Sequence, residues 1–224
     1  MNPLHVSAFS SLALQVVAGL IELWGLSFNV SKEDTILREI LLSEVAVQAV
    51  EFVFYCYLVY KIVFSHVPIT ITSQRYIDWV ITTPIMLINF ALLFLYLNKK
   101  HENRPYFELI KEEAPTLIKI LVANALMLLF GFLGEIGLMN NCISTALGFI
   151  PFAYLFQQLY ANYVGDDVTS QSVFYSIFLV WGLYGVSAVL PFQPKNTMYN
   201  ILDLFSKNVF GVFLSFYIAN KART

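Results

Sequence analysis

Seven long apolar stretches constrain this chain more than any other feature of its sequence. Each holds about 20 residues or more, the length that an α-helix needs to cross the hydrocarbon core of a bilayer. Because 58% of the residues are hydrophobic and only 12% are charged, a soluble fold could not bury these side chains. We therefore expect an all-α membrane protein, a bundle of seven transmembrane helices forming a single domain over residues 1–224. The expected spans are about 8–28, 40–63, 72–98, 115–139, 142–163, 171–192 and 197–219.

The distribution of Lys and Arg predicts how the chain is oriented in the membrane. Nine of these residues fall in or near the connections on one side of the predicted bundle, and two fall on the other side. The positive-inside rule then puts the N-terminus outside the cell and the C-terminus in the cytoplasm. The net charge of −2 also argues against a nucleic-acid partner, which would require a basic surface. The nine are Lys32, Arg38, Lys99, Lys100, Arg104, Lys111, Lys119, Lys221 and Arg223, and the two are Lys61 and Lys195.

Two of the predicted spans hold a pair of opposite charges within about one helical turn. The span 72–98 holds Arg75 and Asp78, and the span 197–219 holds Asp203 and Lys207, which are four residues apart. Ionisable groups are costly at this depth and usually face a partner or a cavity. One interpretation is therefore a structural ion-pair cluster that fixes how the two helices pack.

A second interpretation concerns the amine of Lys207, which lies in an otherwise apolar span. A desolvated lysine can offer its amine to an aldehyde and form a Schiff base. In a medium of low dielectric constant a Schiff base keeps its proton only beside a carboxylate. Asp78 and Asp203 are the two candidate counterions.

Two motifs resemble those of microbial rhodopsins. Residues 75–84 (RYIDWVITTP) are similar to the signature of the third helix, and residues 203–207 (DLFSK) to the motif of the seventh. The resemblance covers essentially the whole chain. It implies all-trans retinal bound covalently to Lys207, with Asp78 and Asp203 as counterions and Arg75 as their external partner.

The same resemblance implies a set of retinal-pocket residues. Aromatic and Met side chains suit a flat polyene, and a glycine leaves room for its ring. Three positions depart from the family pattern: a usual proline is Gly185, and two usual tryptophans are Ala188 and Asn141. These departures affect the expected absorption colour of the protein and the expected shape of the pocket. The implied pocket residues are Trp79, Thr83, Met86, Met127, Gly131, Ser144, Thr145, Trp181 and Tyr184.

Three predicted spans carry lengthwise polar stripes. Their members recur at offsets of 0, 4, 7 and 11 residues, or a subset of these, which keeps them on one helix face. Interhelical hydrogen bonds of about 0.6 kcal/mol each would explain one or two such residues. Three long stripes point instead to a hydrated seam whose acidic groups attract cations. The stripes are Ser11, Gln15 and Glu22; Glu44, Gln48, Glu51 and Tyr55; and Asn196, Asn200, Asp203 and Lys207.

A subset of these residues also resembles the viral rhodopsins of large algal viruses that act as light-gated cation channels. We therefore favour a light-gated cation channel that lies in the lipid bilayer. We expect no enzymatic activity. The alternatives are an outward proton pump, disfavoured because Asn89 stands at the usual proton-donor position, and a sensory rhodopsin that signals through a partner. The transported ions would be monovalent cations or protons. The chain could also form a homo-oligomer. The subset is Ser11, Glu44, Gln48, Glu51, Lys195, Asn196 and Asn200.

Overall fold

The computed structural model describes residues 2–64, 71–101 and 103–223. In these ranges the regular structure is helical, and seven helices are long and apolar enough to cross a membrane. The all-α fold class is confirmed, and the chain is an integral, multi-pass membrane protein. The elements are α1 (Pro3–Leu26), α2 (Thr35–Phe64), α3 (Ile71–Leu97), α4 (Tyr106–Glu112), α5 (Ala114–Glu135), α6 (Asn141–Tyr163), α7 (Val168–Ala188), α8 (Phe192–Asp203), the π-helical turn η1 (Leu204–Asn208) and α9 (Val209–Lys221).

Several helix ends differ from the predicted boundaries because polar residues extend or stop a helix independently of hydropathy. Helices α1, α2 and α8 begin at residues 3, 35 and 192, not near 8, 40 and 197. Asn2 caps α1 by accepting a hydrogen bond from the amide of Leu4 (3.0 Å). Helix α5 ends at Glu135 instead of near residue 139, and Gly137 just beyond it has φ +76°, a value that favours glycine.

The short helix α4 lies between the predicted spans 72–98 and 115–139, where hydropathy indicates no membrane helix. Its first residue, Tyr106, and Leu109 are buried, whereas Phe107 is exposed. The segment is therefore partly packed against the bundle.

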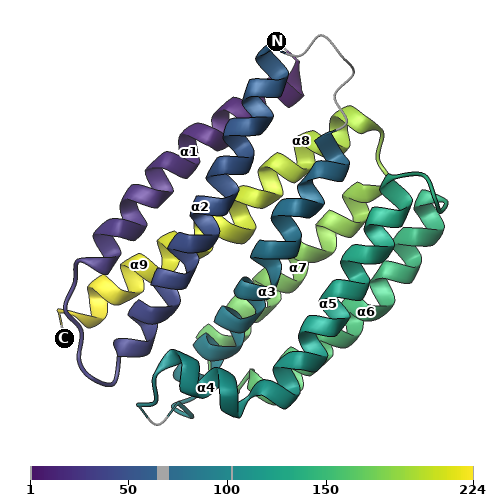
Figure 1. Cartoon of the computed structure of the whole chain (residues 1–224). Coiled ribbons are helices and arrows are strands. Elements are labelled where there is room, and N and C mark those ends of the chain that lie inside the picture. Colours follow the sequence, from purple (N-terminus) through teal and green to yellow (C-terminus); the bar gives the residue numbers. More distant parts are fainter. Residues whose placement is uncertain (1, 65–70, 102, 224) are drawn as a thin grey trace.

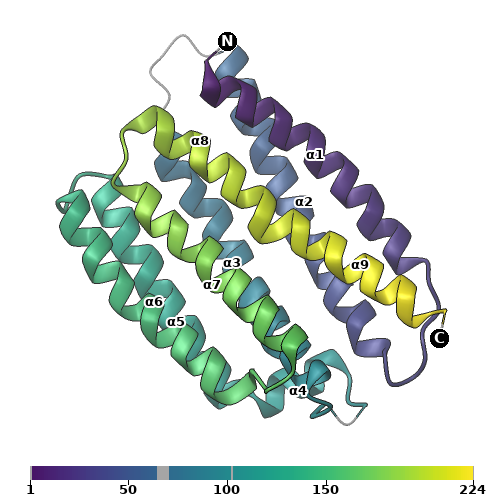
Figure 2. The same cartoon turned by 180° about the vertical axis from the view of Figure 1, so that it is seen from behind.

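The long helices run alternately up and down in one bundle. The N-terminus lies at one end, and α4 and the C-terminus lie at the opposite end (Figures 1 and 2). Helices α1 and α2 pack against each other and against the continuous rod formed by α8, η1 and α9, while α5 and α6 form a close pair on the other side. Helix α3 contacts both groups, so its side chains can reach the bundle interior from either side.

The outer surface of the bundle is apolar, as a lipid-facing surface requires. Leu20, Ile77 and Leu179, on three different helices, each expose more than 60% of their surface. Many charged and amide side chains of the spans are buried instead. The polar groups therefore face one another inside the bundle.

Candidate functional site

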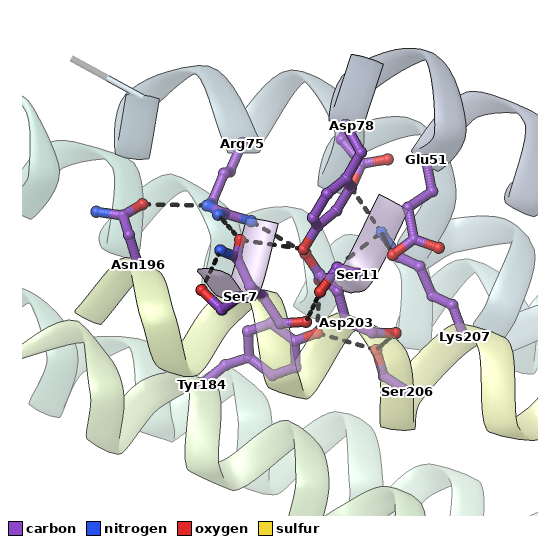
Figure 3. A network of polar contacts seen from close by, with 12 residues as sticks. Ser7, Ser11, Glu51, Arg75, Asp78, Tyr184, Asn196, Asp203, Ser206 and Lys207 are labelled. Carbon is purple, nitrogen blue, oxygen red and sulfur yellow. Dashed lines mark hydrogen bonds and ion pairs between the residues drawn. The ribbon is translucent and has the colours of Figure 1, made fainter. Parts of the chain in front are cut away.

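Lys207 lies at the centre of a buried cluster of charges (Figure 3). Its Nζ donates a hydrogen bond to Asp78 Oδ2 on α3 at 2.6 Å and lies 3.9 Å from Asp203 Oδ1. The side chains of Lys207 and both aspartates are almost fully buried. The structure thus brings together the amine and the two carboxylates that the sequence singled out.

The π-helical turn η1 sets the direction of the side chains next to Lys207. The amide of Val209 bonds to the carbonyl of Leu204, which is the wide i to i+5 pattern that often marks a functional position in a helix. Within this turn Ser206, Lys207 and Asn208 are all buried. Three consecutive residues can therefore face the interior, which a regular α-helix next to lipid would not allow. Sequence reasoning missed Asn208 because offsets of an ideal helix place it beside the polar stripe.

Asp203 is held by donors from three other helices (Figure 3). It accepts hydrogen bonds from Arg75 Nη1 (3.0 Å), the Tyr55 hydroxyl (2.8 Å) and the Tyr184 hydroxyl (2.7 Å). Arg75 also donates to Asn196 and Asn200 of α8. Asp203 is therefore well stabilised as a carboxylate, with Arg75 on the side toward the N-terminal end of the bundle.

Glu51 of α2 is a third carboxylate in the cluster. Its Oε1 lies 4.0 Å from Lys207 Nζ, and its Oε2 accepts a hydrogen bond from Asn208 Nδ2 (3.0 Å). The sequence assigned Glu51 to the ion pathway, but the structure also puts it beside Lys207. Among the described residues of this cluster, three carboxylates therefore face the two cations Arg75 and Lys207.

An apolar cavity extends from Lys207 between α3, α5, α6 and α7. It encloses an empty volume of about 770 Å³, including its open mouth, within the usual range for ligand pockets. All the pocket residues that the resemblance implied line it, together with Lys207 itself. These are Trp79, Thr83, Met86, Met127, Gly131, Ser144, Thr145, Trp181 and Tyr184.

Other lining residues were not anticipated, above all Phe149 and Phe152 of α6. A Cβ built on Gly185 would lie 2.6 Å from Phe149 Cζ, so Phe149 fills the space that the family's usual proline would occupy. Ala188 also lines the cavity. Gly185 and Ala188 therefore belong to one wall of the cavity, where α6 and α7 meet.

The polar stripes of α1, α2 and α8–α9 meet in a seam, as their spacing predicted. Ser11 donates to the backbone carbonyl of Asn200 (3.0 Å), which joins α1 to α8. Gln48 donates to the carbonyl of Gln15 (3.1 Å) and to Asn208 Oδ1 (3.3 Å), which joins α2 to α1 and η1. We call this set of contacts, from Ser11 and Asn200 to Gln48, the polar seam.

At the N-terminal end of the bundle the two predicted pathway residues of α8 separate. Asn196 donates to Thr72 Oγ1 (2.8 Å) and accepts from Arg75, so it lies in line with the seam. Lys195 forms an ion pair with Glu135 at the end of α5 (2.9 Å). The structure thus places Lys195 on the α5 side and not with the seam contacts.

At the other end of the bundle the seam leads to Glu44. Asn89 Nδ2 donates to Glu44 Oε1 at 2.6 Å, so the amide at the usual donor position has a carboxyl group bound to it. Glu22 of α1 is also buried, with its carboxylate against Gly211 of α9. The sequence argument from Asn89 alone overlooked this neighbour because Glu44 lies on a different helix.

A family model described as Bacteriorhodopsin-like protein matches residues 5–221. The crystal structure of viral rhodopsin OLPVRII has a TM-score of 0.84 and 30% identity, covering 97% of this chain and 98% of that one. The light-driven ion pump xanthorhodopsin has a TM-score of 0.74 at 16% identity, over 98% of this chain and 94% of its own, and so shares the fold alone.

Curated relatives agree at lower coverage. The green-light absorbing proteorhodopsin of Gamma-proteobacterium EBAC31A08 is 26% identical over 161 residues, which are 64% of this chain and 59% of that protein. The opsin-like protein carO of Fusarium fujikuroi is 27% identical over 159 residues, which are 62% of this chain and 46% of carO. The chain thus spans less than two thirds of the length of these relatives. The family match itself extends over nearly the whole chain, and the chain belongs to the bacteriorhodopsin-like family of microbial rhodopsins, light-driven transporters and photoreceptors that bind a retinal chromophore.

Proposed function

We propose that this protein is a photoreceptor that carries all-trans retinal on Lys207. The cavity fits a long apolar molecule, because aromatic and Met side chains line it and its polar end is the amine of Lys207. Asp78 Oδ1 and Glu51 Oε1 are buried there without a hydrogen-bond partner among the described residues. Such oxygens suit a site in which a cationic Schiff base and ordered water complete the charge network. Retinal bound in this way supplies light absorption and a light-driven change of shape.

The residues around Lys207 would then have distinct roles. Asp78, at 2.6 Å, is the nearest counterion and the natural acceptor of a proton from the lysine nitrogen. Asp203 is held by Arg75 and two tyrosines, so it would stay ionised and keep Arg75 in place. Transfer of a proton to Asp78 would change the charge balance that fixes Arg75 and Asp203.

We further propose that the protein acts as a light-gated cation channel along the polar seam. The observation that carries this proposal is a pair of hydrogen bonds at Asn208, which donates to Glu51 and accepts from Gln48. Asn208 follows Lys207 in the same π-helical turn, so a displacement of Lys207 would act directly on the groups that close the seam. Glu44 and Glu51 supply negative charge along the route, which favours cations over anions.

The proposed orientation has the N-terminus outside the cell and the C-terminus in the cytoplasm. Nine of the thirteen Lys and Arg residues belong to the connections, helix ends and terminus on the α4 side. Cations would then enter near Ser11, Asn196 and Asn200 and leave near Glu44. Lys195, paired with Glu135, would influence the entrance only through its charge.

A light-driven outward proton pump is the second candidate, and one contact favours it. The hydrogen bond from Asn89 to Glu44 puts a carboxyl group next to the position where a pump has its proton donor. The carboxyl group of Glu44 could supply a proton toward Lys207, whereas the amide of Asn89 cannot.

The deciding experiment is voltage clamp of retinal-supplied cells, swept across membrane potentials at two external sodium concentrations. A photocurrent that reverses sign, with a reversal potential that follows sodium, is the result expected of the channel. An outward current that never reverses would favour the pump and overturn the channel. A protein that has a visible absorption band but carries no current would favour the sensory role. The control is the Lys207→Ala variant, which cannot hold the chromophore.

A further inference from the structure

Tyr106, the first residue of α4, occupies an unusual position for a residue of an interhelical connection. Its side chain is buried, with 9% of its surface exposed, whereas the next residue, Phe107, exposes 75%. The hydroxyl of Tyr106 donates to Asn89 Oδ1 at 2.7 Å and lies 3.2 Å from Ser43 Oγ. The connection between α3 and α5 therefore sends one side chain into the space between α2 and α3.

The backbone of Tyr106 is anchored as well. Its amide donates to Glu39 Oε2 of α2 at 2.9 Å. Pro105 precedes it as the N-cap and makes no side-chain hydrogen bond to the helix, so Glu39 provides the main polar contact at this end of α4. The short helix is thus attached to α2 through Glu39 and Ser43 and to α3 through Asn89.

These contacts continue the polar seam to the surface. Asn89 uses its carbonyl to accept from Tyr106 and its amide nitrogen to donate to Glu44. A chain of hydrogen bonds therefore runs from Tyr106 through Asn89 to Glu44, which lies one turn from Gln48 on α2. The Tyr106 ring belongs to the main apolar cluster of the bundle, together with Ile40 and Leu93. An apolar ring across a polar route excludes water by dewetting.

We propose that Tyr106 is the gate at the α4 end of the seam, and that α4 moves away from α2 and α3 when the seam opens. The proposal deepens the transport function above, because a hydrated seam that ended under Tyr106 would conduct nothing. The closed state, however, belongs to the dark protein and can be tested without light. The same gate would control proton access to Glu44 if the protein were a pump.

The test measures access to Ser43, whose Oγ lies 3.2 Å from the Tyr106 hydroxyl. Ser43→Cys is introduced into a protein in which the exposed Cys56 and Cys142 are replaced by alanine. The rate of modification by a membrane-impermeant maleimide is then followed in the dark by mass spectrometry. Tyr106→Ala should raise this rate at least fivefold, and Phe107→Ala, on the exposed face of the same helix, should leave it unchanged.

An equal rate in the Tyr106→Ala and Phe107→Ala proteins would overturn the gate. If Tyr106→Ala prevents folding, seen as loss of the visible absorption band, Tyr106→Phe decides instead. That variant keeps the ring but loses the hydroxyl contact to Asn89 that holds the ring across the seam. The ring should then be displaced more often, and we expect at least a twofold faster modification. No increase in that variant would equally exclude the gate. A wild-type protein that absorbs light without carrying a current would contradict the transport function. The modification rates in the dark would still test whether Tyr106 closes the seam.

Discussion

Asn208, the residue after Lys207, donates a hydrogen bond of 3.0 Å to Glu51 on α2. Two neighbouring residues of one π-helical turn therefore contact two different helices: Lys207 binds Asp78 of α3, and Asn208 binds Glu51 of α2. This arrangement connects the chromophore site to the polar seam through a single peptide unit. It makes Glu51 a member of both.

Replacing Glu51 by Gln should therefore change the colour of the protein. A negative charge near the lysine nitrogen stabilises the positive charge of the ground state, and its removal should shift the absorption maximum to longer wavelength. The shift should be smaller than that of Asp78→Asn, because Glu51 lies 4.0 Å from Nζ and Asp78 lies 2.6 Å from it. An absorption spectrum of the purified proteins measures both. A Glu51→Gln spectrum identical to the wild type would show that Glu51 is already uncharged in the dark.

The double substitution Glu44→Gln and Glu51→Gln should alter the photocurrent. Removing both carboxylates from the seam weakens its attraction for cations, so we expect a smaller current or a shifted reversal potential. Asp166→Asn is the control, since it removes a carboxylate from an exposed position between α6 and α7. Currents that stay unchanged in the double variant would rule out a pore along these residues.

Breaking the buried pair of Arg75 and Asp203 should destabilise the protein strongly. Arg75→Gln or Asp203→Asn removes one member of the buried pair and unbalances the charge cluster, at a cost of about 3–5 kcal/mol. The double variant should lose less than the sum of the two single losses, because neither charge then remains. Thermal loss of the visible band provides the measurement. Additive losses would mean that the two groups act independently despite their distance of 3.0 Å.

Gly185→Ala should disturb the cavity wall. The added Cβ would lie 2.6 Å from Phe149 Cζ, so the ring must move, at a cost of about 1–3 kcal/mol. Gly182→Ala, three residues earlier on α7, meets Phe152 at an ordinary 3.6 Å and is the control. We expect a lower melting temperature and a displaced absorption maximum for Gly185→Ala alone. Phe149→Ala in the same protein should partly restore the melting temperature.

Asp34, in the connection before α2, should make stability depend on acid pH. Partial burial raises the pKa of its carboxyl, but hydrogen bonds from Tyr96 and Ser31 and nearby positive charges outweigh this, and the pKa ends below its ordinary 3.8. Because the folded pKa is the lower one, the stabilisation is present above pH 3.8 and is lost as the pH falls through the folded value.

Asp34→Asn should therefore lower the stability at pH 7 by about 0.5 kcal/mol, since the group is only partly buried. The difference from the wild type should shrink as the pH is lowered below 3.8. Asp166→Asn, at an exposed position between α6 and α7, is the control. A difference that persists unchanged at low pH would show that Asp34 acts through packing and not through its charge.

The sequence by itself determined the membrane class and the fold class, and it singled out Lys207, Asp78 and Asp203, which the structure brings together. Length and hydropathy limit an apolar chain in lipid to a small set of folds. A charged side chain inside a membrane span is so costly that its presence indicates a specific role. Helical periodicity, together with the helix arrangement of the resembled fold, predicted that the polar stripes would face one another. In the structure Ser11 contacts Asn200 and Gln48 contacts Gln15.

The tertiary structure decided what periodicity cannot express. The π-helical turn brings Asn208 inward, α4 buries Tyr106, and Glu44 binds Asn89 across two helices. Each depends on a local irregularity or on the rotation of one helix against another. These are set by packing over the whole bundle, so the pattern of any single segment does not contain them.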